Sequence, residues 1–117
     1  MREGNRRGAI EDVIARTDRN HPTKVFLSQQ VQYGDYHWRF YAIKAGRDDL
    51  LSGPQFDFFE PSVTPPERIP SGALVLTTAT ASVDVAFAER AKLTLVKQIA
   101  DLDGTVSFLV FQNKHNN

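Results

Sequence analysis

The chain of 117 residues contains no cysteine, which excludes a disulfide framework, a thiolate nucleophile and a zinc site built on cysteine. Basic and acidic residues both number 14, so no net charge draws the molecule towards nucleic acid or a membrane surface. No apolar run is long enough for a signal sequence or a membrane span. We therefore expect a soluble cytoplasmic protein with no membrane partner, or a component of a virion or host cell if the source is viral.

Residues that carry metal or catalytic chemistry are sparse and scattered. The three histidines, His21, His37 and His115, lie far apart and form no His-x-x-x-His or Glu-x-x-His pair, so we predict no metal and no cofactor. Neighbouring carboxylates occur in segments that resemble turns, where solvation is their usual role: Asp48 with Asp49, Asp57 with Glu60, and Asp101 with Asp103. No phosphate loop, nucleophile elbow or dinucleotide fingerprint occurs. We expect a protein that is not an enzyme. An enzyme built on loop carboxylates ranks third, after the two binding hypotheses given at the end of this subsection.

The length suits a single domain over residues 1–117, and an apolar content of 41% is ordinary for a folded protein. Three segments lack a regular pattern. Residues 1–7 are polar and basic and predict a flexible N-terminal arm, and residues 113–117 predict a polar tail. Residues 46–72 hold five of the six prolines and predict a long proline-rich loop.

The most readable segment is 24–45, in which two runs rich in Val, Phe, Tyr and Trp flank Gly34 and Asp35. A Gly-first pair favours a two-residue β-hairpin turn, because Gly accepts the positive φ that the turn requires. Alternation then predicts a buried apolar face with Trp38 and Phe40. The opposite face would present a polar patch made of Gln30, Gln32, His37, Arg39 and Tyr41.

Apolar positions at i, i+3, i+4 and i+7 predict an amphipathic helix over 8–20. Segment 73–83 is rich in Val, Leu and Thr and predicts a strand, as does 105–112. Segment 84–103 favours a helix, with Gly104 as a left-handed cap. It also fits a strand that turns at Asp103 and Gly104 into 105–112.

These elements predict an α+β fold, in which an antiparallel sheet comprises hairpin 24–45 and strands near 73–83 and 105–112. Both helices, 8–20 and 84–103, would cover the face of Trp38. A mostly-β sandwich with a short N-terminal helix is the alternative if 84–103 is extended. No motif indicates a resemblance to a known family.

Three phenylalanines, Phe56, Phe58 and Phe59, lie in the acidic, proline-flanked loop 46–72. They could form an exposed motif for a protein partner, or tuck under the loop and close a sheet edge. The alternation of Phe56 and Phe58 allows a short edge strand there.

The leading functional hypothesis is an interaction or assembly protein, not an enzyme, that self-associates or binds a protein partner. A structural or accessory component of a virus or phage would fit this pattern. The contact would use strand 105–112 or the phenylalanine-rich loop. The alternative is a module for RNA or single-stranded nucleic acid that uses the polar hairpin face, with Arg39, Tyr41 and His37, and the N-terminal arginines.

Overall fold

The computed structural model describes residues 3–17, 23–51 and 55–114. Within them an α+β fold forms from three α-helices and five strands, with the 3₁₀ turns η1 (Asp48–Leu50) and η2 (Pro66–Arg68) in the connections. The helices and strands follow one another as α1 (Glu3–Ala15), β1 (Val25–Ser28), α2 (Gly34–Lys44), β2 (Phe56–Phe59), β3 (Leu74–Thr78), α3 (Ser82–Arg90), β4 (Thr94–Ala100) and β5 (Val106–Gln112).

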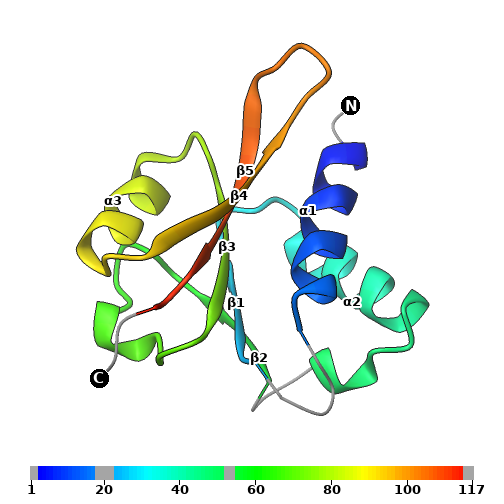
Figure 1. Ribbon diagram of the computed structural model, residues 1–117, viewed down its shortest axis with the longest axis horizontal. Coiled ribbons are helices and arrows are strands. Elements are labelled where there is room, and N and C mark those ends of the chain that lie inside the picture. The colour runs from blue at the N-terminus through cyan, green and yellow to red at the C-terminus, as the bar shows by residue number, and fades with distance from the viewer. Residues whose placement is uncertain (1–2, 18–22, 52–54, 115–117) are drawn as a thin grey trace.

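The five strands form one mixed sheet in the order β2-β1-β3-β5-β4. Strands β2, β1 and β3 are parallel, whereas β5 runs antiparallel to both β3 and β4. Helices α1 and α2 lie on one side of the sheet and α3 lies on the other (Figure 1). The α+β class is confirmed, and the predicted antiparallel pairing holds for β3, β5 and β4 but not for β2, β1 and β3, which are parallel. The prediction of both helices on one face was wrong.

Burial on both faces explains the sequence of the central strands. Val25, Phe26 and Leu27 are consecutive and all fully buried. Val25 and Leu27 face the cluster under α1 and α2, whereas Phe26 faces Phe87 of α3. Such continuous apolar runs are typical of parallel strands that are covered on both sides.

The hairpin prediction for 24–45 was correct for its first strand and wrong for its second, because α2 replaces that strand. Gly34 begins the helix, and no tight hairpin turn forms there. A Cβ atom on Gly34 would lie 3.0 Å from Leu27 Cδ2, so this glycine lets the first turn of α2 approach β1. The helix ends at Lys44, and the left-handed Gly46 that follows it, with φ of 73°, allows Arg47 N to donate to Ala42 O at 2.8 Å.

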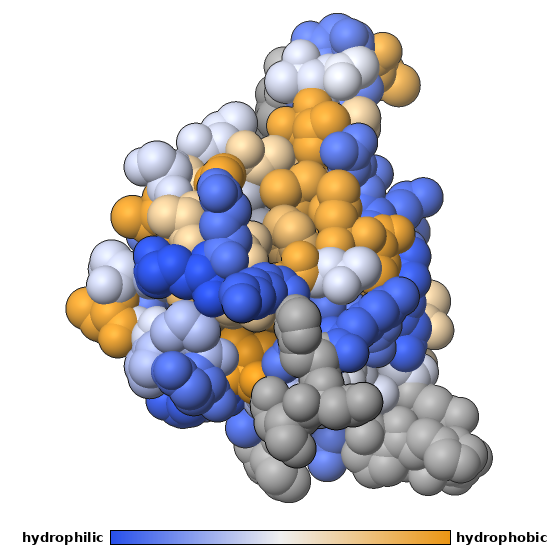
Figure 2. Space-filling view, turned by 60° about the vertical axis from the view of Figure 1, so that its left-hand side comes forward, coloured by the Kyte–Doolittle hydropathy of each residue, from blue (hydrophilic) through white to orange (hydrophobic). Residues whose placement is uncertain are grey.

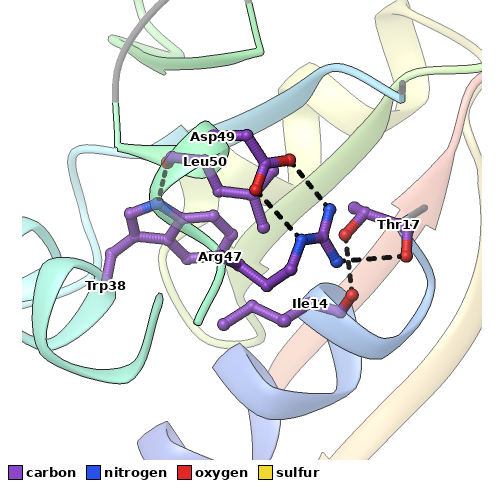
Figure 3. A network of polar contacts seen from close by, with 6 residues as sticks. All are labelled: Ile14, Thr17, Trp38, Arg47, Asp49 and Leu50. Carbon is purple, nitrogen blue, oxygen red and sulfur yellow. Dashed lines mark hydrogen bonds and ion pairs between the residues drawn. The ribbon is translucent and has the colours of Figure 1, made fainter. Parts of the chain in front are cut away.

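Trp38 is fully buried as predicted, but from a helix. Its indole stacks on Phe56 of β2 with ring centroids 4.7 Å apart, and its Nε1 donates to Leu50 O at 2.7 Å. Both partners follow α2 in the chain, Leu50 in η1 and Phe56 in β2. Trp38 therefore holds α2, η1 and the edge strand β2 together, and its only polar atom is satisfied (Figure 3).

The predicted helix 8–20 is confirmed as α1 over 8–15, where Ile10, Val13 and Ile14 are buried. The helix begins earlier, at Glu3, and ends at Ala15, and residues 18–20 lie outside the described part. The predicted arm 1–7 was wrong for residues 3–7, which are helical, and residues 1 and 2 lie outside the described part. Arg47 donates to Thr17 O beyond the end of α1 and makes two bonds of 3.0 Å to Asp49 (Figure 3). This network fastens the end of α1 to the segment after α2.

The predicted strand 73–83 is confirmed over β3 and gives way to α3 at Ser82. Segment 84–103 contains both of its alternatives, because α3 ends at Arg90 and β4 begins at Thr94. Lys92 takes the left-handed conformation, with φ of 54°, that a glycine usually supplies after a helix. Strand 105–112 is confirmed as β5, and β4 and β5 form a hairpin whose loop contains Gly104.

The predicted loop 46–72 is more ordered than expected. It contains η1, the edge strand β2 and η2, with residues 52–54 outside the described part. The first residue of the predicted tail 113–117, Asn113, is buried, and its Nδ2 donates to Ile69 O at 2.8 Å. Residues 115–117 are not described.

Candidate functional site

Helix α2 has two apolar faces on opposite sides. Trp38, Tyr41 and Ala42 form the inner face and are buried against the sheet and α1. The outer face consists of large side chains that remain exposed by 66%, 50% and 55%, in this order: Tyr36, Phe40 and Ile43. Spacings of three and four residues align them along one helix surface. Tyr33, which is exposed by 73%, precedes the helix as its N-cap in a left-handed conformation with φ of 54°. A helix packs on the rest of a domain through one apolar face. The inner face fills that role in α2, so burial of the outer face is not required for folding.

The aromatic rings of the outer face contact rings on the flank of α2 that faces α1. Phe40 meets Tyr41 edge to face at 5.0 Å, and Tyr36 meets His37 in the same way at 5.3 Å. His37 in turn stacks on Tyr41 at 6.4 Å, and the Arg7 guanidinium lies 5.8 Å from the Tyr41 ring centre. These contacts restrict the outer rings before any partner arrives, which lowers the entropy lost on binding.

Two charged residues border the outer face on its other flank. Asp35 and Arg39 are exposed and lie four residues apart, where an ion pair within the helix is common. No ion pair joins them, or joins either to another residue in the described part of the chain. Together with Tyr36 and Phe40 they line a shallow hollow of about 360 Å³. This flank therefore presents one acid, one base and two aromatic rings.

The structure does not place the five residues of the predicted polar patch on one face. Gln30 and Gln32 lie in the turn between β1 and α2, and Arg39 is exposed on the helix. His37 is half-buried and lies 3.4 Å from Arg6 Nη1 of α1, whereas Tyr41 is buried in the core. The premise of a shared hairpin face was wrong, and Arg39 is the member that borders the outer face.

The phenylalanine-rich loop tucks inward, which was one of the two expectations for it. Phe56 and Phe59 are buried on opposite sides of β2, and Phe58 is half-buried. Phe56 packs in the cluster of α1 and α2, and Phe59 contacts Phe87 of α3 at 4.8 Å. The exposed three-residue motif for a partner was therefore wrong, and these rings close the sheet edge.

Ligands commonly bind parallel sheets outside the carboxyl ends of the strands where the strand order reverses, which here lies between β1 and β3. The fully buried Asp84 occupies this place, in the first turn of α3. Its Oδ1 accepts from Ser28 Oγ at 2.6 Å, and its Oδ2 accepts from Thr78 N at 2.8 Å and Thr78 Oγ1 at 2.7 Å. Both oxygens of this carboxylate therefore accept from protein donors, and the three bonds tie α3 to both strands.

The loop carboxylates have structural contacts of their own. Asp49 binds Arg47, and Asp57 accepts from Arg68 Nη2 at 2.9 Å. Asp101 Oδ1 accepts from Ser107 Oγ at 3.1 Å at the base of the hairpin. Within residues 3–17, 23–51 and 55–114, no three His, Asp or Glu residues gather as metal ligands would.

A second apolar area lies over β4 and β5, below the projecting hairpin tip (Figure 2). Leu102 at the tip is fully exposed and stands alone, and Leu95 is exposed by 42%. Val96 and Ile99 are partly buried against the cluster under α1. These two side chains are less exposed than those of the outer face of α2, each of which is at least 50% exposed.

The comparisons with known proteins found no matching family model, no matching curated protein and no matching solved structure. None of the helices that the structure describes is both long and apolar enough to cross a membrane.

Sequence reasoning missed the outer face because it assigned Phe40 to the buried side of a hairpin, together with Trp38. Two signals for a helix were present. Tyr36, Phe40 and Ile43 repeat at i, i+4 and i+7, and Trp38 with Tyr41 repeats at i, i+3. Gly46 follows these residues, and glycine is common just after the last residue of a helix.

Proposed function

We propose that the chain is an interaction protein, not an enzyme, that contacts another protein molecule through the outer face of α2. The observation that carries the proposal is the row of three large side chains on one helix surface, Tyr36, Phe40 and Ile43, each at least 50% exposed. Exposed apolar surface that is contiguous and bordered by polar groups is characteristic of protein interfaces. Isolated exposed residues such as Leu102 are ordinary by comparison.

The chemistry of the outer face suits a binding centre. Tyr and Arg are enriched among the residues that dominate binding energy, and Tyr36, Phe40 and Arg39 adjoin one another here. Fully burying a side chain the size of Phe or Ile is worth about 1.5–3 kcal/mol. The ring contacts of Tyr36 and Phe40 reduce the ordering cost, so more of this energy is available for affinity.

Binding of RNA or single-stranded DNA has weaker support. Arg39 and two aromatic rings can stack on bases, but Asp35 lies in the same hollow and opposes a phosphate backbone. Arg7 and Arg16 are each paired with a carboxylate of α1. A contact that depends on phosphate would weaken steeply with salt, which separates the two hypotheses experimentally.

Photo-crosslinking tests the proposal without knowledge of the partner. A benzoyl-phenylalanine at Phe40 is introduced into the full chain in its source cell, and the same group at the exposed Val85 of α3 serves as a matched control. We expect a protein adduct at position 40 that is several-fold more abundant than at 85, and mass spectrometry identifies it. Equal yields at both positions, or adducts to nucleic acid alone, would refute the proposed function.

A further inference from the structure

The flank that carries Asp35 and Arg39 is complementary to itself. A two-fold axis brings the same flank of two identical helices together in antiparallel order, and such an interface requires that a surface match its own copy. One acid and one base on the same flank, four residues apart and without an ion pair in the described structure, meet this requirement. A flank with charges of only one sign would repel its copy.

We propose that the occupant of the outer face is a second copy of this chain, packed antiparallel with the two-fold axis near Tyr36. This inference rests on the proposed function and names its partner. With the axis there, the Asp35 carboxylate of one copy faces the Arg39 guanidinium of the other, and the reciprocal pair forms as well. The two Tyr36 rings then meet at the axis, and Phe40 of each copy lies near the N-terminal end of α2 of the other.

The hollow on this flank fits the same arrangement. It is lined by Asp35, Tyr36, Arg39 and Phe40, which are the residues that the register brings together. An aromatic ring from the second copy would enter the hollow between the acid and the base, and the charged groups would border it. Burial of the rings strengthens both ion pairs, because the local dielectric falls when water leaves.

The size of the surface sets the expected strength of the dimer. A stable interface buries about 800 Å² on each partner, which is more than one helix face of three turns provides. The dimer should therefore be weak and in rapid exchange. Sedimentation velocity over a wide range of protein concentration is the suitable measurement, because a single dilute sample would contain mainly monomer.

Charge exchange tests the register. Asp35→Arg places two arginines against each other across the axis, and Arg39→Asp places two aspartates there, so each variant alone should dimerise about tenfold more weakly than the native chain. An equimolar mixture of the two variants pairs Arg with Asp at both contacts. We expect the mixture to recover the native degree of dimerisation. Circular dichroism of each variant checks that α2 still folds.

A single cysteine gives an independent test, because the native chain has none. Tyr36→Cys places one thiol beside the axis, and mild oxidation should link two copies rapidly. Val85→Cys on α3 is the matched exposed control and should link at least tenfold more slowly.

The outcomes separate the inference from the proposed function. A chain that stays monomeric at every concentration, or a mixture of the charge variants that fails to recover dimerisation, overturns the antiparallel dimer. A position-40 adduct to a different protein would then leave the proposed function in place. Equal crosslinking at 40 and 85 would remove the proposed function itself.

Discussion

The inner and outer faces of α2 carry similar side chains in opposite surroundings. Trp38 and Tyr41 are buried on the inner face, and Tyr36 and Phe40 are exposed on the outer face, all within 11 helical residues. Hydrophobicity alone therefore does not tell which face folding uses. The inner face is set by what lies beside it, namely Phe56, α1 and the sheet. The outer face contributes to folding only through its own ring contacts.

The neighbours Ala42 and Ile43 provide the sharpest contrast between the two faces. Ala42→Asp puts a carboxylate at a fully buried position with no partner, and we expect this variant to lose its native fold. Ile43→Asp puts the same group in solvent and should change the free energy of unfolding by about 0.5 kcal/mol or less. Circular dichroism and urea unfolding of both variants measure the difference. Equal stability of the two would show that the faces are not distinct.

Substitution of Trp38 and of Phe40, one aromatic residue from each face, should lower the free energy of unfolding by different amounts, although the difference is smaller than for the first pair. Trp38→Ala removes the stack on Phe56 and leaves the Leu50 carbonyl without its donor, so we expect a loss of about 3–5 kcal/mol in unfolding free energy. Phe40→Ala should lose about 1 kcal/mol or less, since the contact with Tyr41 is its main intramolecular one. Urea denaturation gives both values. Trp38→Phe, which keeps a ring but no donor, should fall between them.

Gly34 tests how closely the inner side of α2 must approach the sheet. A methyl group there would meet the fully buried Leu27 at 3.0 Å, and we expect Gly34→Ala to destabilise the fold by about 1 kcal/mol. Gly8 is a control in α1, because nothing lies within 4 Å of a Cβ built there. Gly8→Ala should stabilise slightly, through the better helix propensity of Ala. Thermal unfolding of the pair distinguishes a steric effect from a propensity effect, and an equal gain in both would contradict the close approach.

Substitutions on the outer face of α2 should change the free energy of unfolding least and association between molecules most. The double variant Tyr36→Ser with Phe40→Ser removes most of the outer aromatic surface, and we expect a change in unfolding free energy of about 1 kcal/mol or less. The same variant should abolish concentration-dependent association in sedimentation. If association persists in the folded variant, the outer face is not the contact. Val85→Ser on α3 should leave both measurements unchanged.

The sequence predicted the burial of individual residues more accurately than the helix or strand that carries them. Trp38 was correctly placed in the core, because burial of the only tryptophan is favourable from a strand or a helix. The strand that was to carry it was wrong, since aromatic residues favour strands by propensity and the Gly34-Asp35 pair resembled a turn. Tertiary contacts with Phe56, Leu50 and α1 outweigh that propensity. The same competition divided segment 84–103, where α3 ends at Arg90 and the left-handed residue that follows it is Lys92 in place of the usual glycine.

The sequence by itself determined which segments are apolar, that one amphipathic helix lies near the N-terminus, and that 105–112 is a strand. These follow from local periodicity and from the free energy of removing apolar groups from water. The tertiary structure alone decided that the sheet is mixed, that helices cover both of its faces, and that the outer rings of α2 remain in solvent. The reason is that a helix with two apolar faces can bury only the one for which the rest of the chain supplies a partner.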